Sequence, residues 1–282
     1  MSSRIISGNR NAEDVIRAYY ERLNSNPTAS QPATPAVIPQ TPLVQPTGSI
    51  VNGVYVFDNH QLVQATTPVY RKFLKESGYA DLDSCLRLEV SKGVLRYDQN
   101  VRDNATRVGL GLNGTDGDYV VSINQINGRK LVEGLGGKLL PTQLMYNLFI
   151  PYIKSEAANG NAEAQATLKE MINTKAEWLE DLIVNESSEI LRQKTRKIKI
   201  CNNSVPITLV EDKDGIFDMS DMNGFGYPIN VKDTGGEFRY WHPNGDERAA
   251  IRSRYSELSL CLDGEPSYAY PDLGVRSAKF FP

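Results

Sequence analysis

Several stretches of the 282-residue chain contain residue types that can bind ligands or catalyse reactions. The first is Gly109-Leu-Gly111-Leu-Asn-Gly114, whose G-x-G-x-x-G spacing lets a backbone approach a pyrophosphate at a helix N-terminus. Here a turn and a strand are expected after Gly114 instead of a helix. The motif therefore predicts turn glycines and no dinucleotide site.

A second glycine cluster, Gly134, Gly136 and Gly137, ends at Lys138 and precedes a predicted helix. Successive free amides in such a place can hold an anion. The Walker spacing is absent, because no glycine lies five residues before Gly137 and Leu139 follows the lysine. We therefore expect a connector between a sheet and the helices.

Acidic residues between positions 212 and 221 resemble an oxygen-rich turn of the kind that hard cations prefer. They are Asp212, Asp214, Asp218 and Asp221, with Gly215 and Gly224 nearby. The EF-hand spacing is not met and Lys213 lies among the acids. The pattern favours a solvated loop and no metal site, and it leaves cation binding open.

One dense basic run is present, and it has two interpretations. Its members are Arg192, Lys194, Arg196, Lys197 and Lys199. In the structural interpretation they complement the C-terminal end of a helix dipole and continue into a half-buried strand. In the functional one they bind nucleic-acid phosphates, together with converging side chains such as Arg248, Arg252 and Arg254 or Tyr240 and Trp241.

Catalysis has little support in the sequence. Only His60 and His242 are present, both in turn-like settings, and neither belongs to an H-E-x-x-H motif. Paired carboxylates can meet from distant positions, but the linear order nominates no pair. We expect a protein that is not an enzyme and has no cofactor.

Composition indicates a globular chain, with 40% hydrophobic and 23% charged residues and a net charge of −3. Cys85, Cys201 and Cys261 are odd in number and form no C-x-x-C pair, which favours a reducing compartment such as the cytoplasm. The N-terminus lacks an apolar signal segment, and no run of about eighteen apolar residues exists. We expect no membrane partner.

The central element of the predicted architecture is a helical hairpin at residues 140–196. Apolar residues recur there every three or four positions, with Lys, Glu and Asp between them. Asn161 is the expected cap of a second helix from Ala162, which either runs on to about residue 195 or has a joint near Asn173. The apolar stripe consists of Leu168, Met171, Ile172, Trp178, Leu179, Leu182, Ile183, Ile190 and Leu191.

The flanks, residues 49–139 and 197–282, read as β-rich units because short alternating runs are separated by glycine turns. Strands are predicted at 54–57, 61–63, 86–90, 94–97, 106–112, 119–123, 130–132, 197–200, 206–210, 238–241, 257–262 and 267–270. Short helices are predicted from Pro68 and at 246–255. The predicted fold class is α+β, with two antiparallel β-rich units around the hairpin.

The N-terminal region predicts a docking helix within residues 1–24 on a Pro/Thr/Gln-rich linker at 25–48. A thirteen-residue helix is marginal alone, so its apolar face needs a surface to dock on. Partner contacts are predicted on that face and at one point of the central stripe. These residues are Val15, Ile16, Tyr19, Tyr20, Leu23 and Trp178.

Together these features favour a non-enzymatic structural subunit of a larger protein assembly, which binds its neighbours through an N-terminal arm formed by the docking helix and the linker, residues 1–48. Its partners would be copies of itself or other subunits. The most concrete version is a tailed-phage virion component of the head, neck or tail, located in the virion after synthesis in the cytoplasm. The alternative is an intracellular nucleic-acid-binding or regulatory adaptor that uses the basic run at 192–199.

Overall fold

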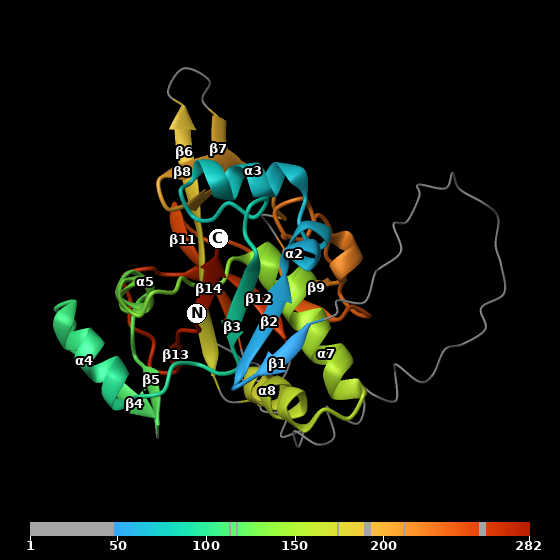
Figure 1. The fold of residues 1–282 in the computed structure, drawn as a ribbon. Helices are drawn as coiled ribbons and strands as arrows, with labels where there is room; N and C mark the ends of the chain where they lie inside the picture. The colour runs from blue at the N-terminus through green and yellow to red at the C-terminus, as the bar shows by residue number, and fades with distance from the viewer. Residues whose placement is uncertain are drawn as a thin grey trace. The chain divides into compact units, whose positions relative to one another are not determined.

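The computed structural model describes residues 48–282 except 113, 117, 174, 189–192, 211–212 and 254–257. These residues belong to one compact α+β unit that begins at Pro46, and its sheets are largely antiparallel (Figure 1). The predicted docking helix, with Val15, Ile16, Tyr19, Tyr20 and Leu23, lies outside the described residues, as does nearly all of the linker. None of the described helices has the length and apolar character that crossing a membrane requires.

A four-stranded antiparallel sheet joins both ends of the unit. Its order is β1-β2-β3-β14. The C-terminal strand therefore completes the sheet that the first strands begin. The bounds are Ser49–Val51 for β1, Val54–Asp58 for β2, Arg87–Ser91 for β3 and Ala278–Phe281 for β14.

Two helices, α2 (Asn59–Ala65) and α3 (Pro68–Glu76), connect β2 to β3. The helix predicted from Pro68 is confirmed, with Thr67 as its cap and the proline in its first turn. The strand predicted at 61–63 is wrong. Asp58 and Gln61 form a reciprocal capping box there, which starts α2 directly after β2.

The next segment is more helical than its glycine turns indicated. It contains α4 (Gln99–Arg107), a small hairpin of β4 (Gly114–Asp116) with β5 (Tyr119–Val121), and α5 (Gln125–Gly134). The strand at 119–123 is confirmed in its first part. The strands predicted at 106–112 and 130–132 are wrong, because the side chains of Asp98 and Asn124 cap the helices that replace them.

The first arm of the predicted hairpin is confirmed as a nearly continuous helical run. It consists of α6 (Thr142–Leu144), the π-helical turn η1 (Met145–Phe149) and α7 (Ile150–Ala158). The next helix, α8 (Ala162–Asn173), starts at Asn161, whose side chain accepts hydrogen bonds from two amides of the first turn. These helices form the helical layer.

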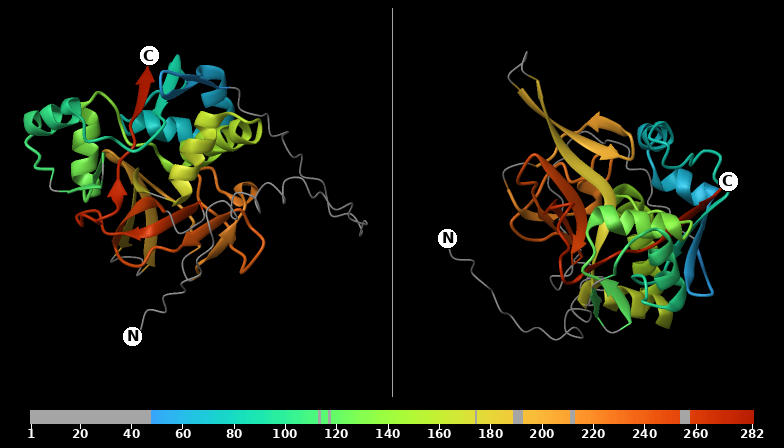
Figure 2. Two further views of the ribbon diagram at one scale, coloured as in Figure 1. Left: turned by 90° about the horizontal axis from the view of Figure 1, so that it is seen from below. Right: turned by 90° about the vertical axis from the view of Figure 1, so that its left-hand side faces the viewer.

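The helical layer lies between the small sheet and a larger one (Figures 1 and 2). On one side Tyr55 of β2 contacts Phe149 edge to face, with ring centroids 5.3 Å apart. On the other side Tyr146 contacts Phe238 at 5.2 Å. Aromatic packing therefore fastens both sheets to one set of helices.

The larger sheet has the order β8-β7-β6-β11-β12-β10-β9, and β13 pairs with β6. The β10–β12 and β13–β6 pairs are parallel and the other pairs are antiparallel. A 3₁₀ turn, η2 (Met219–Asp221), follows β9. The bounds are Ala176–Ser188 for β6, Gln193–Ile200 for β7, Asn203–Pro206 for β8, Gly215–Phe217 for β9, Phe238–Trp241 for β10, Glu247–Ser253 for β11, Ser259–Gly264 for β12 and Leu273–Gly274 for β13.

Strand β6 is the main correction to the predicted architecture. The second arm of the helical hairpin ends at Asn173, and residues 176–188 form the longest strand of the sheet. The helix predicted at 246–255 is also wrong, because β11 occupies most of it. The strand at 238–241 is confirmed, those near 197–200 and 257–262 are confirmed with shifted ends, and no strand forms at 267–270.

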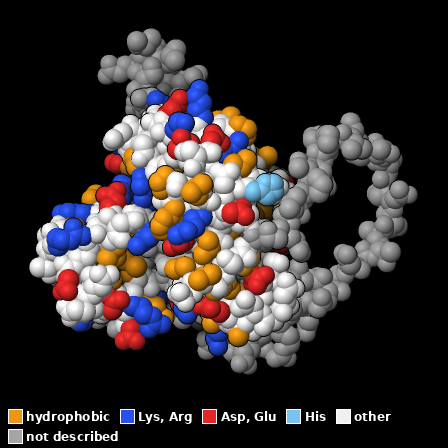
Figure 3. Space-filling view, in the orientation of Figure 1, with side chains coloured by type: hydrophobic (Ala, Val, Ile, Leu, Met, Phe, Trp, Pro, Cys, Tyr) orange, Lys and Arg blue, Asp and Glu red, His pale blue; other side chains and the backbone are white. Residues whose placement is uncertain are grey.

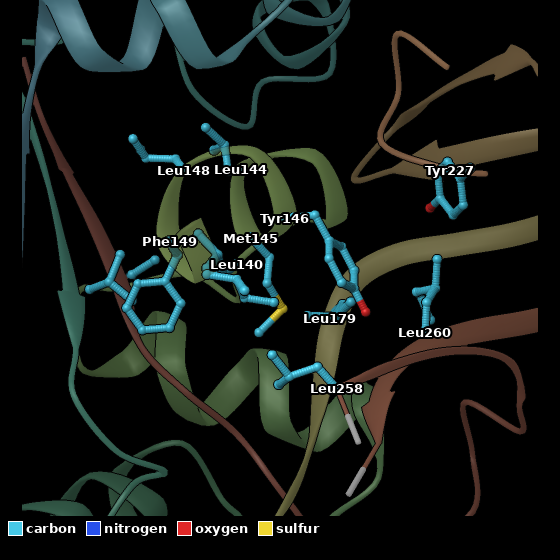
Figure 4. Packing of buried hydrophobic residues seen from close by; sticks show 14 of the residues in the cluster. Leu140, Leu144, Met145, Tyr146, Leu148, Phe149, Leu179, Tyr227, Leu258 and Leu260 are labelled. Carbon is cyan, nitrogen blue, oxygen red and sulfur yellow. The ribbon is translucent and has the colours of Figure 1, made fainter. Parts of the chain in front are cut away.

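Apolar side chains cover both faces of β6. Leu179 and Ile183 belong to the cluster that the helical layer forms with both sheets. Trp178 and Leu182 belong to a second cluster, which includes residues of α4 and α5. Figure 4 shows part of the first cluster, with Met145 of the helical layer and Leu179 and Leu258 of the sheet region.

Candidate functional site

A bulge in β6 brings two consecutive carboxylates into the interior. Trp178 pairs with Ile251 and Leu182 pairs with Ala249, so the three residues 179–181 oppose the single residue Ala250. Bulges of this kind redirect side chains. Glu180 is 1% exposed and Asp181 is fully buried, although the helical interpretation placed both on a polar face. We call residues 179–181 the carboxylate bulge.

Helix α5 satisfies the backbone of the carboxylate bulge. Gln125 donates from Nε2 to the carbonyls of Leu179 at 2.7 Å and Asp181 at 3.2 Å. Arg129, one turn further on, donates from Nη2 to the carbonyl of Glu180 at 2.9 Å. Because residues four apart share one face of a helix, a single face of α5 binds all three carbonyls.

Glu180 is paired with one cation. Its Oε1 lies 2.8 Å from Nε of Arg129, and the Cys201 thiol approaches the same oxygen at 3.9 Å. Burial raises the pKa of Glu180 to about 7, because the lowering by Arg129 is smaller and Asp181 raises the pKa further.

Asp181 is held by hydrogen bonds instead of a cation. The backbone amide of Thr142 donates to Oδ2 at 2.6 Å, and the Thr142 hydroxyl donates to the same oxygen. Burial raises the pKa of Asp181 to about 6, and the bonds from Thr142 only partly oppose this. The start of the helical layer is therefore attached to the carboxylate bulge.

Several buried polar atoms around the bulge have no hydrogen-bond partner among the described residues. The unpartnered atoms include Glu180 Oε2, Asp181 Oδ1, Gln143 Oε1 and Tyr70 Oη. Such groups are costly when charged in an apolar surrounding.

Three tyrosine side chains near the bulge are neutral. Burial raises the pKa values of Tyr70, Tyr79 and Tyr227, and the charges of Glu180 and Asp181 raise those of Tyr70 and Tyr79 further.

A second buried charge cluster lies three residues earlier on the same strand. Arg276 contacts Glu177 from Nη2 at 2.6 Å, and Arg252 contacts it from Nη2 at 2.9 Å. Burial raises the pKa of Glu177, but the two guanidiniums outweigh this and lower it to about 2. Arg252 also donates to two backbone carbonyls. Buried in this way, Arg252 cannot join a phosphate-binding surface as its sequence position suggested.

Trp178, a predicted partner contact, lies inside the chain. Its side chain is 1% exposed, and its indole Nε1 donates to the carbonyl of Ile123 at 2.6 Å. The residue packs in the second cluster and offers no surface to another subunit.

The described members of the basic run lie on β7, not at a helix end. Arg192 is outside the described residues, and Lys194 pairs with Ser187 near the tip of a ribbon that β6 and β7 form (Figure 1). Arg196 donates to the carbonyl of Gly245 at 2.7 Å. Lys197 and Lys199 alternate with the buried Ile198 and Ile200, and Lys199 is exposed.

The described acidic residues between positions 212 and 221 pair with basic side chains of the same chain. Lys232 bridges Asp218 and Asp221 at 3.0 and 3.3 Å, and His242 contacts Asp214 at 2.7 Å. Asp212 lies outside the described residues. Within the described part of the chain, no group of three His, Cys, Asp or Glu side chains is arranged to hold a metal ion.

The glycine motifs lie in turns, a connection and one strand. Gly109 lies just beyond α4 in the left-handed region, with φ of 69°, and Gly111 lines a pocket beside Asn124. Gly114 begins β4, so it is not a turn glycine as predicted. Lys138, at the end of the second glycine cluster, bridges to Ala278 of β14. The segment after Gly134 connects α5 to α6, so it joins two helices and not a sheet and the helices as predicted.

The small sheet has one closed and one open edge among the described residues. Lys138 exchanges backbone hydrogen bonds with Ala278 and so covers part of β14, whereas β1 pairs with β2 alone. Register places Val51 and Val54 on the face opposite the buried Tyr55, and Val51 is 48% exposed. Figure 3 shows groups of hydrophobic side chains on the side of the molecule where β1, β2 and β3 lie.

Comparisons of the chain with protein-family models, curated proteins and solved structures found no match.

Proposed function

We propose that this chain is a structural subunit of a larger protein assembly and that its N-terminal arm attaches it to neighbouring subunits. The observation that carries this proposal is the place of β1. This strand is the first described element after the arm, and it forms the open edge of the small sheet. The arm that would bind a neighbour is therefore connected directly to the small sheet of the described unit.

The chemistry of this edge supports attachment. An edge strand presents unpaired amides and carbonyls that can pair with another chain. Proteins often protect such edges with charged residues or proline, and β1 has neither in its sequence Ser-Ile-Val. The exposed Val51 adds apolar area beside the edge. We infer that copies of this chain or other subunits bind here, and the tailed-phage virion component stays a prediction within this class.

The first test compares the mass in solution of the full-length protein with that of residues 48–282, measured by light scattering. We expect the full-length protein to form a defined oligomer and the shortened protein to be a folded monomer by circular dichroism. Equal stoichiometry of the two proteins would contradict the role of the arm.

A second test uses single substitutions in the full-length protein. Val51→Lys places a charge beside the open edge, and Ile229→Lys is a matched control because Ile229 is similarly exposed, at 59% against 48%. We expect only Val51→Lys to weaken the oligomer. Equal effects of the two substitutions would exclude the edge as the contact.

The β6–β7 ribbon favours nucleic-acid binding as a second candidate function. It places Lys197 and Lys199 on one face of β7, opposite Val184 and Leu182 of β6. Binding through phosphates would weaken steeply with salt, because each neutralised phosphate releases counterions. We expect Lys197→Gln with Lys199→Gln to reduce that salt dependence if this candidate is correct, whereas salt-independent or absent binding of the unaltered protein would exclude it.

A further inference from the structure

The carboxylate bulge contains more negative than positive charge at contact distance. Glu180 and Asp181 are adjacent and buried, and Arg129 is the cation in contact with Glu180. The two buried guanidiniums near β6, those of Arg252 on β11 and of Arg276 just after β13, are bound to Glu177. Two ionised carboxylates with one guanidinium would leave an uncompensated charge in an apolar interior, which is unfavourable.

The groups around the pair do not supply the missing positive charge by direct contact. The surrounding phenols are neutral, and burial also raises the pKa of the Cys201 thiol, with Glu180 raising it further. Lys138 lowers the pKa of Glu180, but Glu133 raises the same pKa. The Nζ of Lys138 donates to the carbonyl of Tyr79 at 2.5 Å. The titratable groups that face the pair come from α3 and the segment after it, from α5, from the connector to α6, from the turn after β7 and from the segment before β10. They are Tyr70, Tyr79, Arg129, Glu133, Lys138, Cys201 and Tyr227.

We propose that the carboxylate bulge is a proton-binding site that holds one proton on the Glu180–Asp181 pair near neutral pH, and that release of this proton loosens the contacts of the bulge with α5 and α6. The step forms or breaks one carboxyl O–H bond and exchanges the proton with solvent. The two carboxylate oxygens without partners, Glu180 Oε2 and Asp181 Oδ1, are the positions that can carry it.

The connections of the bulge explain why proton release would reach two helices. Asp181 binds Thr142 at the start of α6, and Glu180 binds Arg129 of α5. When both carboxylates are ionised, their repulsion and their need for hydration oppose this closed arrangement. Arg129 retains 26% side-chain exposure, so water can approach Glu180 from the side of α5.

Infrared spectroscopy of the full-length protein tests the proton directly, because a protonated carboxyl group absorbs separately from a carboxylate. We expect an acid band that persists well above the usual range for Asp and Glu and titrates at about pH 6 to 7. Glu180→Gln and Asp181→Asn should each alter or remove this band, whereas Glu89→Gln on the small sheet should leave it unchanged.

The absence of the band in the unaltered protein at pH 6, or its persistence in both bulge variants, would overturn the proton site. The measurement on the unaltered protein decides this point even if a variant does not fold.

Amide hydrogen exchange tests the coupling to the helices. After correction for the intrinsic effect of pH, we expect protection of α5 and of residues 142–145 to fall as the acid band disappears. In Glu180→Gln this loss should be smaller than in the unaltered protein. A titrating band without a change in protection would overturn the proposed loosening.

Discussion

The ratio of cations to carboxylates differs between two neighbouring sites on β6. Glu177 has two guanidiniums, which lower its pKa to about 2 despite burial, whereas Glu180 contacts one, Asp181 is held by Thr142 instead, and both have raised pKa values. A carboxyl group whose pKa is lowered by folding stabilises the folded state at pH values above its unfolded-state pKa, and this contribution is lost as the pH falls. A carboxyl group whose pKa is raised by folding has the opposite effect on stability, so its contribution is lost as the pH rises.

Substitution of Glu177 tests the first site. Glu177→Gln leaves Arg252 and Arg276 buried without their carboxylate, and we expect the free energy of unfolding to fall by about 3–5 kcal/mol in urea titrations. Glu89→Gln is the control, because its partner Arg87 is half exposed and such pairs contribute about 0–1 kcal/mol. Similar losses in the two variants would mean that the buried cluster adds no particular stability.

The second site predicts the opposite pH dependence. Because the folded protein binds more protons than the unfolded chain at this site, its contribution to stability should decrease as the pH rises from the ordinary carboxyl pKa values of 3.8 and 4.5 to the folded-state values of about 6 and 7. We expect Glu180→Gln to gain stability relative to the unaltered protein between about pH 4.5 and 7 and to keep that gain at higher pH, measured by urea unfolding at each pH. A constant difference across that range would contradict this assignment.

These sites could not be predicted from the sequence because their partners are distant. Glu177 is 75 residues from Arg252 and 99 from Arg276. The residue types of the Glu-Asp pair were visible, but the apparent helical period placed them on a solvated face. Burial of a carboxylate depends on tertiary packing that linear order does not contain.

At the scale of elements, β6 resembled a helix because a polar pair interrupts a strand that is buried on both faces. In a strand, residues two or four apart share a face. Trp178 and Leu182 therefore pack in one cluster and Leu179 and Ile183 in the other, with the polar Glu180 and Asp181 between them in the sequence. This order of apolar and polar pairs reproduces the i, i+4 spacing of an amphipathic helix.

The helices that sequence reasoning missed had local signals. Asp58, Asp98 and Asn124 each accept a backbone hydrogen bond from the third residue of the following helix. Nearby glycine turns and short apolar runs outweighed these caps in the prediction. The helices α3, α7 and α8 were predictable because proline, the Asn161 cap and a longer apolar period agreed.

Gly128 controls how closely α5 packs on the C-terminal segment. A Cβ there would lie 2.5 Å from Cγ1 of Val275, which is too close for van der Waals contact. Alanine normally stabilises a helix relative to glycine by about 1 kcal/mol. Gly128→Ala should nevertheless destabilise the protein by about 1–3 kcal/mol, because the core becomes overpacked.

A double-mutant cycle checks this contact. Val275→Ala alone should destabilise the protein by creating a cavity, but in the Gly128→Ala background it should cost less or restore stability. Additive free energies of unfolding in urea would show that the two positions do not meet as described.

At the scale of the whole molecule, the C-terminal segment connects parts that sequence order separates. Leu273 and Gly274 pair with β6, Arg276 binds Glu177 on the same strand, and residues 278–281 complete the small sheet beside β3. The two predicted β-rich regions therefore share a sheet. Pairing of residues nearly two hundred positions apart leaves no local signal, so this connection was not predictable from one sequence.

This connectivity predicts that the described unit unfolds in one cooperative transition. The two apolar clusters lie on opposite faces of β6, so neither can lose its packing without disturbing the strand that the other needs. The chain contains two tryptophans, and Trp241→Phe leaves Trp178 as the probe of the second cluster. Far-ultraviolet circular dichroism reports the helices, most of which lie in or against the first cluster. We expect fluorescence and circular dichroism to give the same urea midpoint, and distinct midpoints would mean that the two clusters unfold as separate units in spite of their common strand.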